Sequence, residues 1–196
     1  MKKFYTQDQD GSLKQIPYRD WRPDPNGPTY PRQLLDDPDF RAEHGVLTER
    51  VVSVNVDKRF YTVASSREVV GDDVVVTQTA TPRDIDVVKQ VKRDEAAAKR
   101  YDMEVSGVDV GGYIIPTDRE SQSKLVAVRV LAKEDSTYTV KWKAANGWIT
   151  LDATQIINVA DAVRAHVQSA FDWEAAQVEA IDTLTDAQSV IDYEVT

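Results

Sequence analysis

The sequence predicts an α+β fold, in which a proline-rich arm and a small antiparallel β-sheet precede a connecting helix and a module of short β-hairpins and helices. Three observations support this prediction: prolines gather near the start, β-branched runs follow, and apolar residues then recur at helical spacing. The expected parts are the arm (1–49), a small β domain (50–81), the connecting helix (82–101) and a C-terminal α+β module (102–196).

The arm contains six of the eight prolines. Because proline fixes φ and lacks a backbone donor, we expect neither a regular helix nor a central strand there. The arm is also rich in large apolar side chains, which a solvated tail lacks. It therefore either wraps around its own domain or docks on a partner, and the sequence leaves both alternatives open. A docking arm would bind through its aromatic and leucine side chains, namely Tyr18, Trp21, Tyr30, Leu34 and Leu35.

The β domain contains two β-branched runs on either side of Gly71-Asp72-Asp73, which predicts a hairpin. Two or three strands are not stable alone, so this sheet must pack on the arm, on the next helix or on another chain. Further hairpins are indicated by Gly111-Gly112 and by Asn146-Gly147, each between short apolar runs.

Capping patterns predict four helix starts in the second half of the chain. Thr81 precedes Pro82, which suits the first helical position. The remaining three starts have the capping-box spacing of an N-cap residue and an acceptor three residues later. These pairs are Thr117 with Glu120, Asp152 with Gln155, and Thr185 with Gln188.

The expected helix at 82–101 has a narrow apolar seam of Ile85, Val88, Val91 and Lys92. A long charged helix with such a seam either bridges two modules or self-associates as a coiled coil. Packing on the chain's own sheet is the alternative, and the spacing does not decide between them.

We expect no enzymatic activity, no catalytic residue, no metal site and no cofactor. The chain has no cysteine and only two histidines, and it has no phosphate-binding glycine loop or nucleophile elbow. The polar cluster Asp118-Arg119-Glu120 is explained by a helix start. Residues 152–196 have one basic and nine acidic residues, which disfavours nucleic-acid binding. No apolar run is long enough for membrane insertion.

Several stretches resemble a domain of unknown function from tailed phages, which occurs at the C-terminal end of tail-fibre and tail-fibre-assembly proteins. The resemblance covers about residues 90–193 and includes "GGYIIPTDRESQSKL" at 111–125. It rests on Thr117–Gln122, on the strand end at Trp142-Lys143 and on the helix entry "TLDATQII". The family offers no catalytic residues, and the proline-rich arm has no counterpart in it.

The resemblance implies a non-enzymatic structural component of the virion tail, made in the host cytoplasm and held on the tail fibre or baseplate by its N-terminal half. The alternative is an assembly chaperone that binds the fibre and then leaves. In both cases the expected partner is an oligomeric tail-fibre or baseplate protein. A weaker third option is a sugar-binding tip, with Trp21, Trp148 or Trp173 as the platform.

Overall fold

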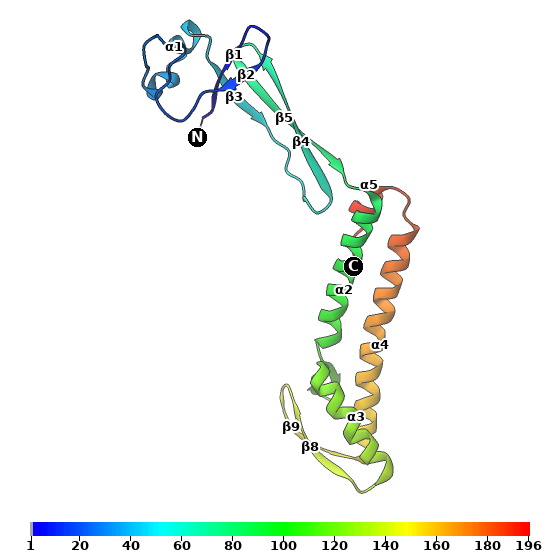
Figure 1. Cartoon of the computed structure of the whole chain (residues 1–196). Helices are drawn as coiled ribbons and strands as arrows, with labels where there is room; N and C mark the ends of the chain where they lie inside the picture. Colours follow the sequence, from blue (N-terminus) through cyan, green and yellow to red (C-terminus); the bar gives the residue numbers. More distant parts are fainter. Residues whose placement is uncertain (1) are drawn as a thin grey trace. The chain divides into compact units, whose positions relative to one another are not determined.

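The computed structural model describes residues 2–196, which fall into two compact units (Figure 1). Unit 1 ends at Pro82 and unit 2 spans Arg83–Thr196. Unit 1 contains a five-stranded sheet, whereas unit 2 combines long helices with two separate hairpins. The predicted α+β class is therefore confirmed.

The sheet of unit 1 has the strand order β2-β1-β3-β5-β4. Its strands are β1 (Phe4–Gln7), β2 (Leu13–Gln15), β3 (Leu47–Val52), β4 (Tyr61–Val70) and β5 (Asp73–Pro82). β3 and β5 pair in parallel, so the sheet is mixed and not purely antiparallel as expected. β5 takes the inner position because Val74 and Val76 are buried against Tyr5, whereas β4 is exposed along most of its length.

The arm forms part of the interior of unit 1. Trp21 and Leu35 are only 6% and 0% exposed, and they pack together with Phe4, Ile16 and Val46. Two short helices also lie in the arm, η1 (Arg32–Asp36) and α1 (Pro38–Glu43). The structure thus joins the ranges 1–49 and 50–81 into one unit, because β1, β2 and the first half of β3 come from the arm and belong to the same sheet as β4 and β5.

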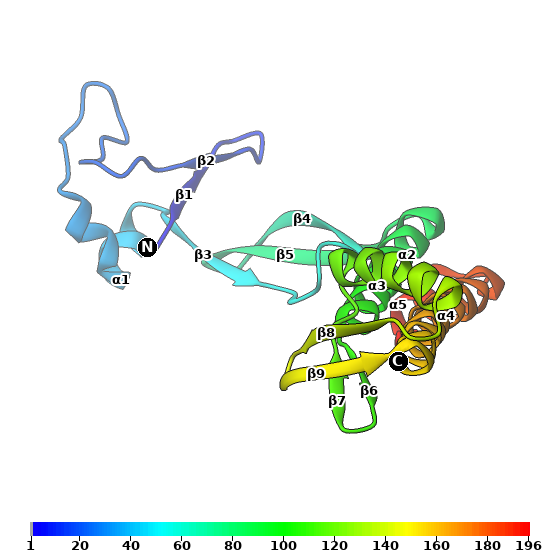
Figure 2. The ribbon, with the colours of Figure 1, turned by 90° about the horizontal axis from the view of Figure 1, so that it is seen from below.

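Unit 2 is arranged around one long helix, α4 (Ala153–Thr183). α2 (Ile85–Val105) runs beside its C-terminal half and α3 (Arg119–Glu134) beside its N-terminal half (Figure 1). Figure 2 shows the two hairpins of this unit beside the helices. The remaining elements are β6 (Val108–Val110), β7 (Tyr113–Ile115), β8 (Thr139–Ala144), β9 (Gly147–Asp152) and α5 (Ala187–Asp192).

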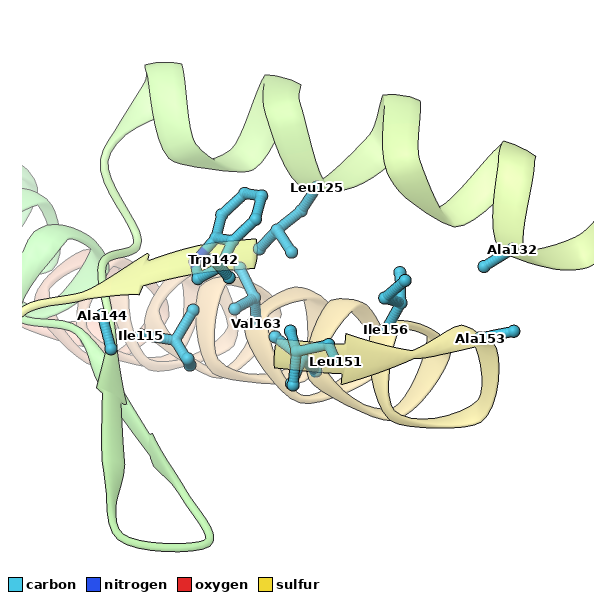
Figure 3. Packing of buried hydrophobic residues seen from close by; sticks show 10 residues of the cluster. Ile115, Leu125, Ala132, Trp142, Ala144, Leu151, Ala153, Ile156 and Val163 are labelled. Atoms are coloured by element: carbon cyan, nitrogen blue, oxygen red, sulfur yellow. The ribbon is translucent and has the colours of Figure 1, made fainter. Parts of the chain in front are cut away.

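The main core of unit 2 lies where α3, α4 and the β8–β9 hairpin meet. Figure 3 shows Leu125 of α3, Trp142 and Leu151 of the hairpin, and Ile156 of α4 directed into a common interior. Ile115 of β7 joins the same cluster. Burial of these side chains supplies the hydrophobic free energy that holds the hairpin on the helices.

α2 packs against α4 and α5 within the same unit. Its buried residues are Val88, Lys92 and Ala96. Much of the seam that suggested self-association through 82–101 is therefore used inside the chain. The helix also begins later than expected, at Ile85, because β4 and β5 stay paired as far as Tyr61 and Pro82.

The helix caps differ from the expected ones at three of the four starts. Thr81 lies within β5 and is not a cap. Asp84 caps α2 instead, because its carboxylate accepts a hydrogen bond from the backbone of Asp86. The start at Asp152 agrees with the sequence. Asp152 and Gln155 each accept a hydrogen bond from the other's backbone N–H, which forms a capping box at the start of α4.

At α3, Asp118 is the N-cap and Thr117 is not, because the Thr117 hydroxyl is buried and bonded elsewhere. Thr117 donates to the carbonyl of Glu104 and accepts from the N–H of Gly107 at 3.0 Å. Glu120 forms no capping box and accepts from Lys124 at 2.5 Å.

At α5 the N-cap is Asp186 and not Thr185, because the Asp186 carboxylate accepts from the backbone N–H of Ser189 at 2.9 Å. The Gln188 side chain donates to Asp192 at 2.9 Å. At both α3 and α5, aspartate replaces the expected threonine one residue later, which agrees with the strong preference for aspartate at this position.

Candidate partner-binding surface

The outer part of the β4–β5 hairpin extends beyond the rest of the sheet. The last residue of β3, Val52, faces Thr77 of β5. Past this point β4 and β5 pair only with each other, over Tyr61–Ser65 and Gln78–Pro82, and we call this part the ribbon. No third strand joins the ribbon within residues 2–196. A two-stranded ribbon is only marginally stable alone, so its open edges suit pairing with another chain.

β4 forms one edge of the whole sheet, and its turn geometry fixes which backbone groups face outward. The strands are joined by the two residues Gly71 and Asp72, and Gly71 has a φ of 61°. In such a hairpin the pair beside the turn, Val70 and Asp73, exchanges hydrogen bonds, and bonding then alternates along the strand. The N–H and C=O groups of Val63, Ser65, Arg67 and Val69 therefore point away from β5.

Two of the five predicted docking residues are exposed on unit 1. Tyr18 is 49% exposed and Leu34 is 37% exposed. The guanidinium of Arg32 lies 4.8 Å from the centre of the Tyr18 ring and 5.0 Å from that of Phe4. Arg32 also donates to the carbonyl of Pro17 at 3.1 Å. Tyr18 is thus held by a cation–π contact, which lowers the entropy it would lose on binding.

The other predicted docking residues lie mainly inside the unit. Trp21 and Tyr30 exchange backbone hydrogen bonds of 2.8 and 2.7 Å, and their rings meet those of Phe40 and His44. Tyr30 is half-buried, whereas Trp21 and Leu35 are buried. Trp21 and Leu35 therefore stabilise unit 1. Their burial supports the alternative in which the arm wraps around its own domain.

A polar hollow of about 810 Å³ lies between the β1–β2 hairpin and the proline-rich segment. Its lining includes charged groups of both signs, among them Asp8, Lys14, Arg19, Asp20 and Arg22. Lys14 pairs with Asp8 at 3.1 Å, and Arg22 donates to Thr29 at 2.9 Å. This lining suits a polar chain segment better than an apolar ligand.

β1 and β3 are tied together by a buried acidic group. Glu49 accepts a hydrogen bond of 2.6 Å from the Tyr5 hydroxyl and pairs with Lys3 at 3.1 Å. Burial favours the neutral acid, but the hydrogen bonds from Tyr5 and Lys3 outweigh it and lower the pKa of Glu49 below its ordinary value. Burial and the bond to Glu49 raise the pKa of the Tyr5 hydroxyl. This arrangement fixes the register of the two strands.

The polar groups of unit 2 that suggested chemistry have structural partners. Hydrogen bonds from Ser121 and Glu120 lower the pKa of Asp118, as expected for a helix cap. Nε2 of His166 lies 2.8 Å from the carbonyl oxygen of Met103. No cluster of three or more metal-ligating side chains occurs in residues 2–196. Over the same residues, no helix has the length and apolar character needed to span a membrane.

Comparison with known proteins gives one match. The model of a family described as a domain of unknown function, DUF4376, matches residues 87–195. This range nearly coincides with unit 2, Arg83–Thr196, and leaves out all of unit 1. No curated protein and no solved structure matches the chain.

Proposed function

We propose that this chain, which belongs to the DUF4376 family, is a non-enzymatic bacteriophage tail protein: a structural virion component held on the tail fibre or baseplate by unit 1. The observation that supports this proposal most is the division of the chain. The family match coincides with unit 2, so unit 1 is a separate body available for attachment. The resemblance of Thr117–Gln122 and "TLDATQII" to a tail-fibre-associated domain supplies the phage context.

Attachment would use the ribbon and the exposed side chains of the arm. A strand of the fibre or baseplate protein adds to the outward backbone groups of β4, and main-chain hydrogen bonds supply most of the affinity. Tyr18 and Leu34, which are both exposed, add apolar contacts to the partner. Trp21 and Leu35 contribute indirectly, by holding the arm in place.

A second function, a tail-fibre assembly chaperone, is favoured by the same open edge. A chaperone can protect an unassembled fibre subunit by pairing a free strand edge with it. β4 is such an edge strand and has ten residues. The two functions differ in whether the protein remains in the finished particle.

Mass spectrometry of purified phage particles decides between them, with peptide counts scaled to a known tail protein. The structural function predicts a fixed copy number in the particle. The chaperone function predicts absence from the particle and co-purification with fibre protein from infected lysate. Absence from both fractions would contradict the tail assignment.

The docking surface is tested by binding of the full chain to the fibre or baseplate protein so identified. Ser65→Pro removes an outward N–H that β5 does not use, and proline is tolerated at such edge positions. We expect Ser65→Pro and Tyr18→Ser each to weaken binding by about tenfold, equivalent to about 1.4 kcal/mol. Trp148→Ser, which changes an exposed aromatic residue of unit 2, is the matched control. Equal binding by all three variants would place the contact elsewhere.

A further inference from the structure

One side of α4 has a regular row of residues that the core of unit 2 does not use. Starting at Arg164, the row advances by alternate steps of four and three residues, which is the spacing of a coiled-coil seam. Its members are Arg164, Gln168, Phe171, Ala175, Val178 and Asp182. Most buried residues of α4, such as Ile156, Val159, Ala170 and Ile181, lie on a different side of the helix. We call the row the α4 seam.

The N-terminal half of the α4 seam borders a groove of about 370 Å³ between α3 and α4. Val126 and Val130 of α3 line this groove and are 64% and 52% exposed. Its charged rim is mainly basic, with Arg129 and Lys133 from α3 and Arg164 from α4. Asp161 is the only carboxylate among the residues that line the groove, and it lies 2.8 Å from Arg129 and 4.0 Å from Arg164. This half is an apolar groove with a basic rim.

The C-terminal half of the α4 seam has the opposite charge. Phe171, Ala175 and Val178 form a shallow apolar strip there, and Phe171 is 46% exposed. The strip is bordered by the carboxylates of Glu174, Glu179 and Asp182. α2 neutralises two of these carboxylates, because Arg100 pairs with Glu174 and Arg93 pairs with Asp182. The Arg100 guanidinium also lies 4.6 Å from the centre of the Phe171 ring. Within residues 2–196, Glu179 has no ion-pair partner, and neither does Lys133 of the groove.

The two halves are complementary to each other, and they lie on one side of one straight helix. They cannot meet within a single chain. We propose that a second copy of this chain covers the α4 seam, with the two α4 helices antiparallel. Arg164 then lies opposite Asp182 of the second copy, Gln168 opposite Val178, and Phe171 opposite Ala175. Each basic groove receives the acidic apolar strip of the other copy, in an isologous interface.

Charge decides the direction of the pairing. In a parallel pair, Asp182 and Glu179 would lie beside their own counterparts, and like charges in contact disfavour association. The antiparallel pair replaces these contacts with two identical sets of opposite charges. The proposed dimer is independent of the tail function and also of unit 1.

The first test is the molar mass of the full chain by sedimentation velocity over a range of concentrations. We expect a reversible monomer–dimer equilibrium. Ala175→Glu puts a charge at the centre of the interface and should raise the dimer Kd by about tenfold or more. Ala176→Glu is the matched control, since it adds the same charge at the next position of α4, outside the seam, and should change the Kd by less than about twofold. Circular dichroism checks that both variants keep the helix content of the native chain.

A chain that stays monomeric at all concentrations would overturn the proposal, and so would equal effects of the two alanine variants. The direction of pairing is tested by cross-linking, which is simple because the native chain has no cysteine. Chains with Gln168→Cys and chains with Val178→Cys are oxidised separately and as a mixture. Disulfide-linked dimers that form only in the mixture support antiparallel pairing, whereas linked dimers of either chain alone would exclude it.

Discussion

The two units differ in how their interiors are built. The main core of unit 2 joins ten buried residues from two helices and three strands around α4. Among the described residues of unit 1, one buried cluster has five residues, all from the arm, and another has three at the centre of the sheet. A large shared core makes a unit stable by itself, whereas small clusters leave the surrounding strands with little apolar support. We therefore expect unit 2 to fold alone and the ribbon of unit 1 to gain most from a partner.

The difference between the two units is tested most directly with fragments of the chain. A fragment of residues 83–196 should fold cooperatively, because it contains all of unit 2. A fragment of residues 102–196, the module expected from sequence, lacks most of α2 and exposes the side of α4 that α2 covers. We expect the shorter fragment to lose cooperative thermal unfolding, as measured by circular dichroism. Equal stability of the two fragments would show that α2 is not part of the unit.

The second prediction concerns Trp21, the largest side chain in the core of unit 1. Trp21→Ala removes its packing on Leu35 and Tyr30 and should lower the free energy of unfolding of unit 1 by about 3–5 kcal/mol. Denaturant titration followed by hydrogen exchange would show the loss in unit 1 alone. Tyr18→Ala, on the exposed side of the same arm, should cost less than about 1 kcal/mol. Similar losses for the two variants would contradict the wrapped arm.

The third prediction concerns Thr117, which joins the end of α2 to the start of α3. Thr117→Val keeps the shape of the side chain but leaves the carbonyl of Glu104 and the N–H of Gly107 without their buried partner. We expect unit 2 to lose about 1–3 kcal/mol of unfolding free energy, as measured in urea. Thr185→Val changes an exposed threonine and should stay within about 0.5 kcal/mol of the native chain.

The smallest expected effect concerns Glu49. Its pKa is lowered in the folded state, so the unfolded chain binds more protons as the pH falls. Its contribution is complete above the unfolded pKa of about 4.3 and is lost as the pH falls through the lower folded pKa. Glu49→Gln should cost about 1 kcal/mol at neutral pH and should flatten the pH dependence of unit 1 below pH 5 or so. An unchanged acid profile would mean that Glu49 is not ionised in its pair.

Local sequence patterns predicted the helices and hairpins well, but not which strands pair with each other. The hairpins at Gly71 and at Gly111-Gly112 follow from residues that suit tight turns. The helix at 153–183 follows from its apolar spacing and its capping box. The inner position of β5 and the parallel pairing with β3 depend on contacts between distant residues, and no local pattern records them. The predicted threonine caps were wrong, because an aspartate within three residues of each threonine caps the helix instead.

The candidate surface was predicted only in part. Composition indicated an arm rich in aromatic residues, but it did not distinguish buried Trp21 from exposed Tyr18, which depends on how the arm folds back. The ribbon was missed because it depends on the strand lengths that the structure shows. β4 and β5 each have ten residues, whereas β3 has six, so the hairpin extends beyond β3.

The boundary between the units has a consequence for the gene. The strand β5 ends at Pro82, α2 begins at Ile85, and the family match starts two residues later, at 87. A recombination event at these codons would exchange all of unit 1 and would leave the core of unit 2 intact. A fusion of residues 83–196 to a different N-terminal segment would likewise keep every residue of unit 2.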